Sequence, residues 1–209
     1  MEMKDKREQI LDTAEELFAE FGYEGTTVRD LAAKANVNVA MISYYFGSKE
    51  KLMETLIEDR SGYMRSRLVS LNESDMDPFQ RIEVLIEYYV ERLFTMNRFH
   101  RILYREISLQ QRSQFNEVIS KLMMRNFNEM RKLMEDGIKK KAFRKIDIEL
   151  TIATLIGTIS QVVLSSFMTC QMLKLDPETN SIFDKKHKER VKSHLKEMMR
   201  SHLLILQHA

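Results

Sequence analysis

Residues that make turns are unusually rare in this chain. It contains six Gly and two Pro among 209 residues, whereas average usage would give roughly 14 and 10. A fold of many short strands needs frequent turns, and long helices need few. Because 44% of the residues are hydrophobic, the chain can also bury a sizeable core. The sequence therefore predicts an all-α fold.

Apolar residues at spacings of three and four, together with capping residues, locate the helices. Thr27 and Asp30 have the spacing of a capping box, Asn36 suits a left-handed helix end, and Asp77-Pro78 suits a helix start. The predicted helices cover residues 10–21, 27–35, 39–45, 49–70, 78–94, 97–108, 115–134, 148–173 and 184–207.

Two domains are expected from this pattern. The N-terminal domain covers residues 1–50, and the C-terminal domain covers residues 51–209. The long helix at 49–70 links the two. Neither an internal repeat nor a low-complexity run is present.

Charge alone does not point to a nucleic-acid partner. The net charge is +2, and residues 1–51 hold seven Lys and Arg against ten Asp and Glu. Within residues 26–51 the balance is +2, because the acidic excess belongs to the first predicted helix. A DNA-binding surface is therefore compatible with the charge distribution but is not demanded by it.

No pattern of a catalytic, metal or cofactor site is found in the sequence. The single cysteine, Cys170, excludes an intramolecular disulfide framework and a Cys-rich zinc site. Four histidines near the C-terminus lie seven, eight and six residues apart, which is not the spacing of four that places two imidazoles on one metal; they are His187, His194, His202 and His208. A nucleophile elbow, a phosphate loop and paired carboxylates with a base are also missing. We expect neither an enzyme nor a bound cofactor.

One segment raises the question of a membrane span. Residues 150–173 form an uncharged run of 24 residues, long enough to cross a bilayer. Nine of these residues are Ser, Thr or Gln, which suits a helix buried between protein surfaces. The first 16 residues reach acidic side chains before any apolar stretch that could serve as a signal peptide. We therefore expect a cytoplasmic protein without a membrane partner.

The most specific segment is residues 26–52, TTVRDLAAKANVNVAMISYYFGSKEKL. Two short helices joined by a tight turn, behind a supporting helix, form a helix-turn-helix pattern. Ala32 and Ala35 are small enough to let the second short helix cross closely, and Ile42 fills the junction. The outer face of residues 38–45 is then free to enter a major groove.

This segment resembles the DNA-binding region of the TetR family of bacterial transcriptional regulators. The matching residues, within a region of about residues 8–56, are Thr27, Leu31-Ala32, Ala35, Val37, Ile42, Tyr44-Tyr45-Phe46, Ser48-Lys49-Glu50 and Leu52. The chain departs from the common family pattern, which has Gly, Ser, Gly and Tyr at the positions of Asn36, Asn38, Ala40 and Ser43. The resemblance implies an N-terminal DNA-binding domain, a helical C-terminal domain for ligand binding and dimerisation, and a small-molecule effector.

The chemistry of the segment fits contacts to DNA. The hydroxyl of Thr27 and the free N–H groups of a helix start can hold a phosphate oxygen. Lys49 and Tyr45 can also reach phosphates, while Val39 can contact a thymine methyl group. The candidate DNA-binding residues are Thr27, Arg29, Asn38, Val39, Ala40, Met41, Ser43, Tyr44, Tyr45 and Lys49.

Aromatic, Met and polar residues of the C-terminal domain are candidates for an effector pocket, since Met suits adaptable pockets. Residues of these types at helical spacing can equally be ordinary core. The candidate set is Tyr89, Phe94, His100, Tyr104, Phe127, Met130, Thr158 and Gln161.

The last predicted helix has two apolar stripes. One stripe steps by four, three, four and three residues, the pattern of a heptad seam; its members are Val191, Leu195, Met198, His202 and Ile205. A second stripe beside it contains Met199, Leu203 and Leu206. Two stripes favour two neighbours, one from the same subunit and one from a second copy, although a helix wrapped only by its own domain is the alternative. The predicted dimer interface is Ile159, Val163, Phe167, Val191, Leu195, Met198, His202 and Ile205.

The sequence thus predicts a homodimeric, TetR-like repressor that binds a pseudo-palindromic DNA operator. Its expected partners are double-stranded DNA, a second copy of the chain and an unknown small-molecule effector that releases it from DNA. The alternative is a small-molecule binding protein whose helix-turn-helix no longer binds DNA specifically, and Ser43 motivates it because it lacks the phenol that family members often direct to a phosphate.

Overall fold

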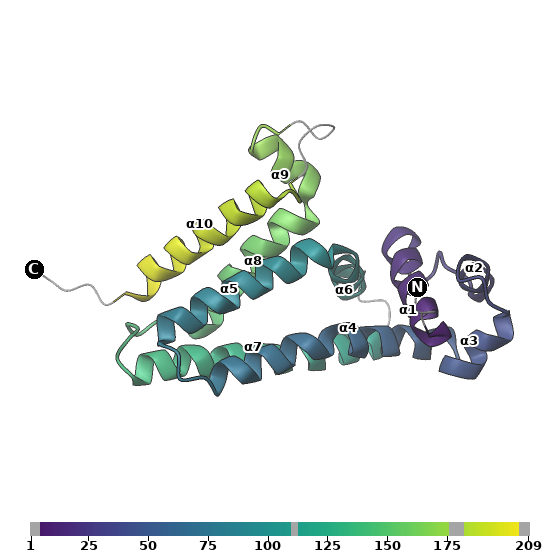
Figure 1. Ribbon diagram of the computed structural model, residues 1–209, viewed down its shortest axis with the longest axis horizontal. Helices are drawn as coiled ribbons and strands as arrows, with labels where there is room; N and C mark the ends of the chain where they lie inside the picture. The colour runs from purple at the N-terminus through teal and green to yellow at the C-terminus, as the bar shows by residue number, and fades with distance from the viewer. Residues whose placement is uncertain (1–4, 110–112, 176–181, 205–209) are drawn as a thin grey trace, which may run out of the picture. The chain divides into compact units, whose positions relative to one another are not determined.

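The computed structural model describes residues 5–109, 113–175 and 182–204. Within these ranges every regular element is a helix, which confirms the predicted all-α fold (Figure 1). The helices are α1 (Lys6–Phe21), α2 (Val28–Lys34), α3 (Val39–Phe46), α4 (Lys49–Asn72), α5 (Pro78–Thr95), α6 (Asn97–Leu109), α7 (Ser113–Lys139), α8 (Ile148–Leu164), α9 (Ser166–Met172) and α10 (Lys185–Leu203).

The chain divides into two compact units. The first comprises Met1–Tyr63 and Arg98–Met123, and the second comprises Met64–Asn97 and Met124–Ala209. The first unit is therefore larger than the N-terminal domain expected from the sequence. The difference arises because apolar side chains of α6 and α7, such as Phe99 and Phe115, belong to the same buried cluster as those of α1 to α4.

Tertiary packing keeps the two short helices of the first unit folded. α2 has seven residues and α3 has eight, too few for a stable isolated helix in water. Their inward residues Leu31 and Ile42 are 0% and 1% exposed, and they lie in one core with Phe18 of α1 and Leu52 of α4. Burial of a side chain of this size contributes about 1.5–3 kcal/mol.

Local side chains cap these helices, and the predicted capping box and left-handed helix end of α2 are confirmed. Thr27 and Asp30 form the complete capping box at the start of α2. Asn38 caps α3, with its Oδ1 accepting a hydrogen bond from the Ala40 N–H at 2.9 Å. Asn36 has a φ of 49°, the left-handed conformation expected at the end of α2. Local signals therefore fix where both short helices begin and where α2 ends.

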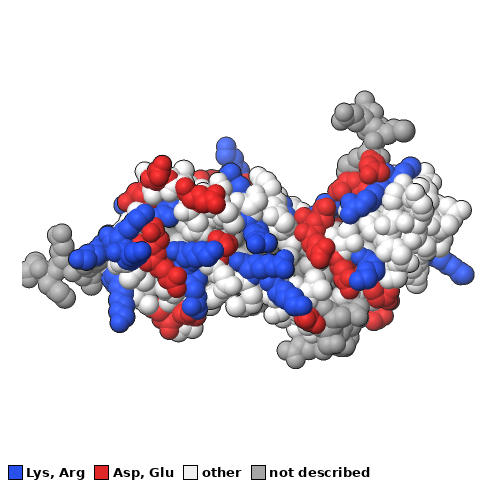
Figure 2. All heavy atoms as spheres, turned by 90° about the horizontal axis from the view of Figure 1, so that it is seen from below, with Lys and Arg blue, Asp and Glu red and all other residues white. Residues whose placement is uncertain are grey.

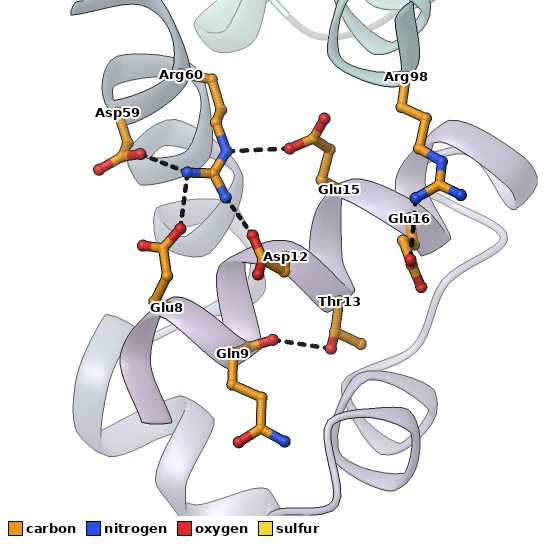
Figure 3. A network of polar contacts seen from close by, with 9 residues as sticks. All are labelled: Glu8, Gln9, Asp12, Thr13, Glu15, Glu16, Asp59, Arg60 and Arg98. Carbon is orange, nitrogen blue, oxygen red and sulfur yellow. Dashed lines mark hydrogen bonds and ion pairs between the residues drawn. The ribbon is translucent and has the colours of Figure 1, made fainter. Parts of the chain in front are cut away.

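Arg60 of α4 ties α4 to α1 through a network of carboxylates (Figure 3). Its guanidinium nitrogens lie 2.9 Å from Glu8, 2.7 Å from Asp12 and 3.0 Å from Glu15, and Asp59 adds a fourth carboxylate at 2.8 Å. Burial of Arg60 acts to lower its pKa, but the hydrogen bonds to Glu8 and Glu15 outweigh burial and raise it. The network fixes the alignment of α4 along α1.

The second unit is built on apolar packing between α5, α8 and α10. Leu85, Leu155 and Leu195 are each 0% exposed in its core. Ion pairs from α10 to α5 line its surface; they join Lys188 to Glu91, Lys196 to Glu87 and Arg200 to Glu83. On the face drawn in Figure 2, Lys and Arg side chains are likewise interspersed with Asp and Glu side chains. Exposed pairs contribute little each, so the apolar core holds α10 and the pairs set its alignment.

The predicted helix at residues 148–173 is wrong in one respect. Ser165 interrupts it, so that α8 and α9 are separate helices bent by 93°. Adjacent serines, here Ser165 and Ser166, are a known cause of sharp helix bends. Among the described residues, no single helix combines the length and hydropathy of a membrane span, and α8 and α9 reach that threshold only when they are counted as one.

Close packing in the second unit requires a glycine in α7. A Cβ atom built on Gly137 would lie 2.1 Å from Cδ2 of the Phe143 ring. Phe143 is 2% exposed, and its ring packs against that of Phe79 with centroids 4.9 Å apart. A larger residue at Gly137 therefore displaces a buried aromatic ring.

We predict that Gly137→Ala lowers the free energy of unfolding by about 1–3 kcal/mol, the usual cost of overpacking. Urea unfolding followed by circular dichroism measures the change. The matched control is Gly62→Ala in α4, where an added Cβ meets no atom within 4 Å; it raises the free energy of unfolding by about 0.5–1 kcal/mol. A Gly137→Ala chain as stable as the parent would contradict the packing described here.

Candidate nucleic-acid interface

α3 presents one face to the core and the other to solvent. Ile42 and Phe46 are 1% and 7% exposed, whereas Val39 is 44% and Tyr44 is 82% exposed. Burial of the first pair fixes the rotation of the helix about its axis. A helix with an exposed face of this kind has the width that a major groove admits.

The other candidate residues of α3 follow the same division. Ala40 and Ser43 are exposed, while Met41 and Tyr45 are half-buried. The Tyr45 ring packs against the core and meets the Tyr44 ring edge to face, with centroids 5.1 Å apart. Tyr45 thus supports the exposed Tyr44 ring. The residues brought together on the outer face are Val39, Ala40, Ser43 and Tyr44.

The start of α2 carries a tight polar cap. The Thr27 hydroxyl and its backbone N–H both donate to Oδ2 of Asp30, at 2.6 and 2.8 Å. The hydrogen bond from the Thr27 hydroxyl holds the pKa of Asp30 below its usual range. The hydroxyl proton of Thr27 is therefore engaged inside the cap, and exposed Arg29 is the cation that this helix end offers.

Lys49 has a role in the fold, and its predicted phosphate contact stays a prediction. Its Nζ donates to the backbone oxygens of Tyr23 and Thr26, at 3.0 Å each. The same ammonium group lies 4.0 Å from the centre of the Tyr23 ring, which adds a cation–π contact. These contacts fasten the start of α4 to the turn between α1 and α2.

A further support of the helix-turn-helix was not predicted from the sequence. The side-chain amide of Gln9 in α1 donates to the backbone oxygen of Ala35, at 2.9 Å. Ala35 caps the C-terminal end of α2, so this bond ties the end of α2 to α1. No local pattern indicates it, because the two residues are distant in the sequence.

The candidate effector residues are divided between the two units. His100 and Tyr104 lie in the first unit, and the other six lie in the second. Within the second unit, Phe94 and Met130 are 7% and 1% exposed in the core. The remaining four are the partly buried Tyr89, Phe127 and Thr158 and the exposed Gln161.

A pocket of 320 Å³ lies between α8 and α10; its lining is Asp147, Leu150, Thr151, Thr154, Met198, Met199 and His202. It shares no residue with the candidate effector set. His202 Nδ1 lies 3.2 Å from a guanidinium nitrogen of Arg144, and its Nε2 lies 3.0 Å from the Thr151 hydroxyl. Because arginine only donates hydrogen bonds, this geometry places the imidazole hydrogen on Nε2.

Three of the predicted dimer-interface residues lie instead in the core of the chain itself. Ile159 and Leu195 are 0% exposed and Val163 is 3% exposed, so a second copy cannot reach them and the prediction was wrong for these three. The inward stripe of α10 is in fact Leu195, Met199 and Leu203. Of the other five, Phe167 is 64% exposed, Val191, Met198 and His202 are half-buried, and Ile205 lies outside the described residues.

Metal-ligating residue types are scattered in the described ranges. No three His, Cys, Asp or Glu side chains come together there as a metal site requires. Cys170 is a free, buried thiol in α9.

A capped α2, an α3 with one face exposed and a supporting α1 are the parts of a DNA-binding helix-turn-helix. The class defined by this fold is therefore that of helix-turn-helix transcriptional regulators. Residues 10–56 match the family model of bacterial regulatory proteins, tetR family. Residues 10–56 of this chain are therefore similar to the N-terminal region of TetR-family transcriptional regulators.

Two curated relatives agree with this assignment. The probable HTH-type transcriptional regulator YttP of Bacillus subtilis is 25% identical over 197 residues, covering 93% of this chain and 94% of the relative. IcaR of Staphylococcus aureus, the HTH-type negative transcriptional regulator of the biofilm operon icaADBC, is 30% identical over 106 residues. That match covers 51% of this chain and 54% of IcaR.

Solved structures share the fold. The TetR family transcriptional regulator PfmR from Thermus thermophilus aligns with a TM-score of 0.73 at 18% identity, over 99% of this chain and all of that one. The regulator FadR from Bacillus subtilis, solved with stearoyl-CoA, aligns with a TM-score of 0.67 at 20% identity, over 90% of this chain and 96% of FadR.

We predict that Lys49→Met lowers the free energy of unfolding by about 1–3 kcal/mol in the absence of DNA. The substitution keeps the alkyl chain but removes the hydrogen bonds of the ammonium group to the Tyr23 and Thr26 oxygens. The matched control is Lys51→Met, which removes an exposed charge paired with Glu54 and leaves the stability essentially unchanged. Equal stability of both variants in urea unfolding would show that the contacts of Lys49 do not stabilise the fold. Only the predicted phosphate contact would then remain for Lys49.

Proposed function

We propose that this regulator is a repressor that binds a pseudo-palindromic operator as a homodimer and leaves it when a small-molecule effector binds. Each subunit inserts α3 into one major groove, so the two half-sites lie about 34 Å apart or a multiple of that. The observation that carries the proposal is the outer face of α3, with Val39 and Tyr44 exposed over a buried Ile42 and Phe46. The description of the relative IcaR as a negative regulator supports repression.

Base recognition by α3 is proposed to be mainly apolar. Val39 and Ala40 lie on its outer face in the first turn, and neither can donate or accept a side-chain hydrogen bond. Such side chains discriminate bases by contact with the thymine methyl group. Tyr44 and Ser43 carry hydroxyls that suit phosphate oxygens, which position the helix without reading sequence.

The dimer surface is proposed to lie on the outer sides of α8 and α9. Leu150, Phe167, Met168 and Met172 are 66%, 64%, 52% and 72% exposed. Residues 150–173 contain no charged side chain, so a second copy can cover this surface without burying an unpaired charge. Exposed apolar surface of this extent is typical of a protein interface.

The effector is proposed to bind in the second unit. Its core contains adaptable and aromatic side chains, including Met130, Tyr89 and Phe127. The structural relative FadR was solved with stearoyl-CoA, which makes an acyl chain with an anionic head a chemical class to test. Such a ligand releases DNA only if it binds the DNA-incompetent state of the dimer more tightly than the competent one.

Selection of bound duplexes from a random library, with the full chain, tests DNA binding directly. We predict enrichment of an inverted repeat, with an affinity that falls steeply as salt rises. Val39→Asn changes the preferred base pair at one position of each half-site, with a discrimination of about 1–3 kcal/mol. Tyr44→Phe weakens binding to all sequences and leaves the base preference unchanged.

The selection also distinguishes the proposed function from the alternative one. A chain that enriches no sequence, and whose weak DNA binding does not depend on base order, is a small-molecule binding protein with an inactive helix-turn-helix. A base preference altered by Tyr44→Phe but not by Val39→Asn would contradict the proposed division of roles.

Phe167→Glu is predicted to convert the dimer into a folded monomer, because it places a charge on an exposed apolar surface. Sedimentation equilibrium would then give a mass of 24.8 kDa in place of twice that value. Met76→Glu is the matched control, since Met76 is an exposed Met that lies outside α8 and α9, and it leaves the mass of the dimer unchanged. If the Phe167→Glu protein were still a dimer, α9 would not be part of the interface.

A further inference from the structure

Several cations of the first unit are bound to groups of the fold itself. Ion pairs join Lys34 to Glu16, Arg98 to Glu16 and Lys51 to Glu54, at 3.0, 2.9 and 2.7 Å. Arg60 is surrounded by four carboxylates (Figure 3), and the Lys49 ammonium is bound to two carbonyl oxygens. DNA binding nevertheless depends on cations that replace the counterions of phosphates. Phosphate binding therefore depends on the cations that these groups do not engage.

Two arginines near the helix-turn-helix are without an acidic partner among the described residues. Arg29 is exposed at the start of α2. Arg7 is half-buried in the first turn of α1. Its guanidinium lies over an aromatic ring, with Cζ 5.6 Å from the centre of the Phe46 ring. Both guanidinium groups therefore keep their full charge available to an anion.

The position of Arg7 is set by the end of α3. Phe46 is the last residue of α3 and is 7% exposed, so its ring is fixed in the core of the first unit. A guanidinium stacked on that ring is held in place by a cation–π contact. α1 begins beside α3 in Figure 1, although Arg7 and Phe46 are far apart in the sequence. Arg29 thus lies at the start of α2, and Arg7 of α1 lies beside the end of α3. These are the two ends of the helix-turn-helix.

We propose that Arg7 binds the DNA phosphate strand that borders the major groove at the C-terminal end of α3. This inference rests on the DNA-binding function proposed above. Arg7 is proposed in addition to Lys49, whose ammonium group gives two of its three N–H donors to backbone oxygens. A guanidinium offers five N–H donors in a planar array, so it can stack on Phe46 and still donate to a phosphate oxygen at its edge. Arg7 is a positioning residue that carries no base specificity.

The salt dependence of binding isolates this contact. The probe is the duplex that the wild-type chain enriches from a random library, and affinity is measured by fluorescence anisotropy between 50 and 200 mM salt, a range in which phosphate contacts dominate the change. Arg7→Gln makes the slope of log K against log salt shallower by about 1.8, because a dimer carries two copies and each phosphate contact contributes about 0.9. The preferred base sequence stays the same.

Two further variants separate a phosphate contact from a packing role. Arg7→Lys retains the charge but loses the planar stack on Phe46, and it keeps a slope close to that of the wild type. Lys34→Gln removes the same charge from a residue already paired with Glu16, and it leaves the slope unchanged. Thermal unfolding of each variant verifies that all three chains are folded at the assay temperature.

The outcomes are distinguishable from failure of the proposed function. A wild-type chain that binds no duplex overturns both proposals together. Wild-type binding with an unaltered slope for Arg7→Gln overturns the assignment of Arg7 alone, and so does an equal loss of slope in Lys34→Gln, which would indicate a general charge effect.

Discussion

The outer face of α3, which is proposed to contact DNA, depends on the burial of two side chains on the inner face of this very short helix. α3 has eight residues and cannot persist as a helix without tertiary contacts. Ile42 and Phe46 supply those contacts in the core of the first unit, and by doing so they direct Val39 and Tyr44 outward. Loss of this anchoring would remove both the helix and the orientation of its outer face.

Charged residues of the first unit are used largely to hold the fold. Lys49 fastens the turn before α2, Asp30 closes its cap, and Arg60 aligns α4 with α1. The cations that hold the fold are less available to phosphates than those without a carboxylate partner. This use of charge favours a DNA contact in which α3 recognises bases by apolar side chains. Arg7 and Arg29 then bind phosphates at the two ends of the helix-turn-helix.

The sequence predicted the features that local signals determine. The capping box of Thr27 and Asp30, the left-handed Asn36 and the bounds of α3 all depend on residues within a few positions of one another. The sequence also predicted the helical fold, because the apolar spacing of each long helix is a local property.

What the sequence could not predict are contacts between distant residues and the rotation of long helices. Lys49 looked like a free cation because its carbonyl partners belong to a turn more than twenty residues away. Spacing placed Leu195 in the stripe predicted for a second copy, and only the packing of the second unit shows that it faces inward. The bend at Ser165 had no stronger local sign than two adjacent serines.

The central claim is that each chain presents one α3 to DNA and that two chains present it twice. Hydroxyl-radical footprinting of the full-length protein on a duplex selected by it tests this claim most directly. The account predicts two equivalent protected segments related by two-fold symmetry, with centres about 34 Å or a multiple of that apart along the helix axis. A single protected segment, or protection spread evenly along the duplex, would contradict it.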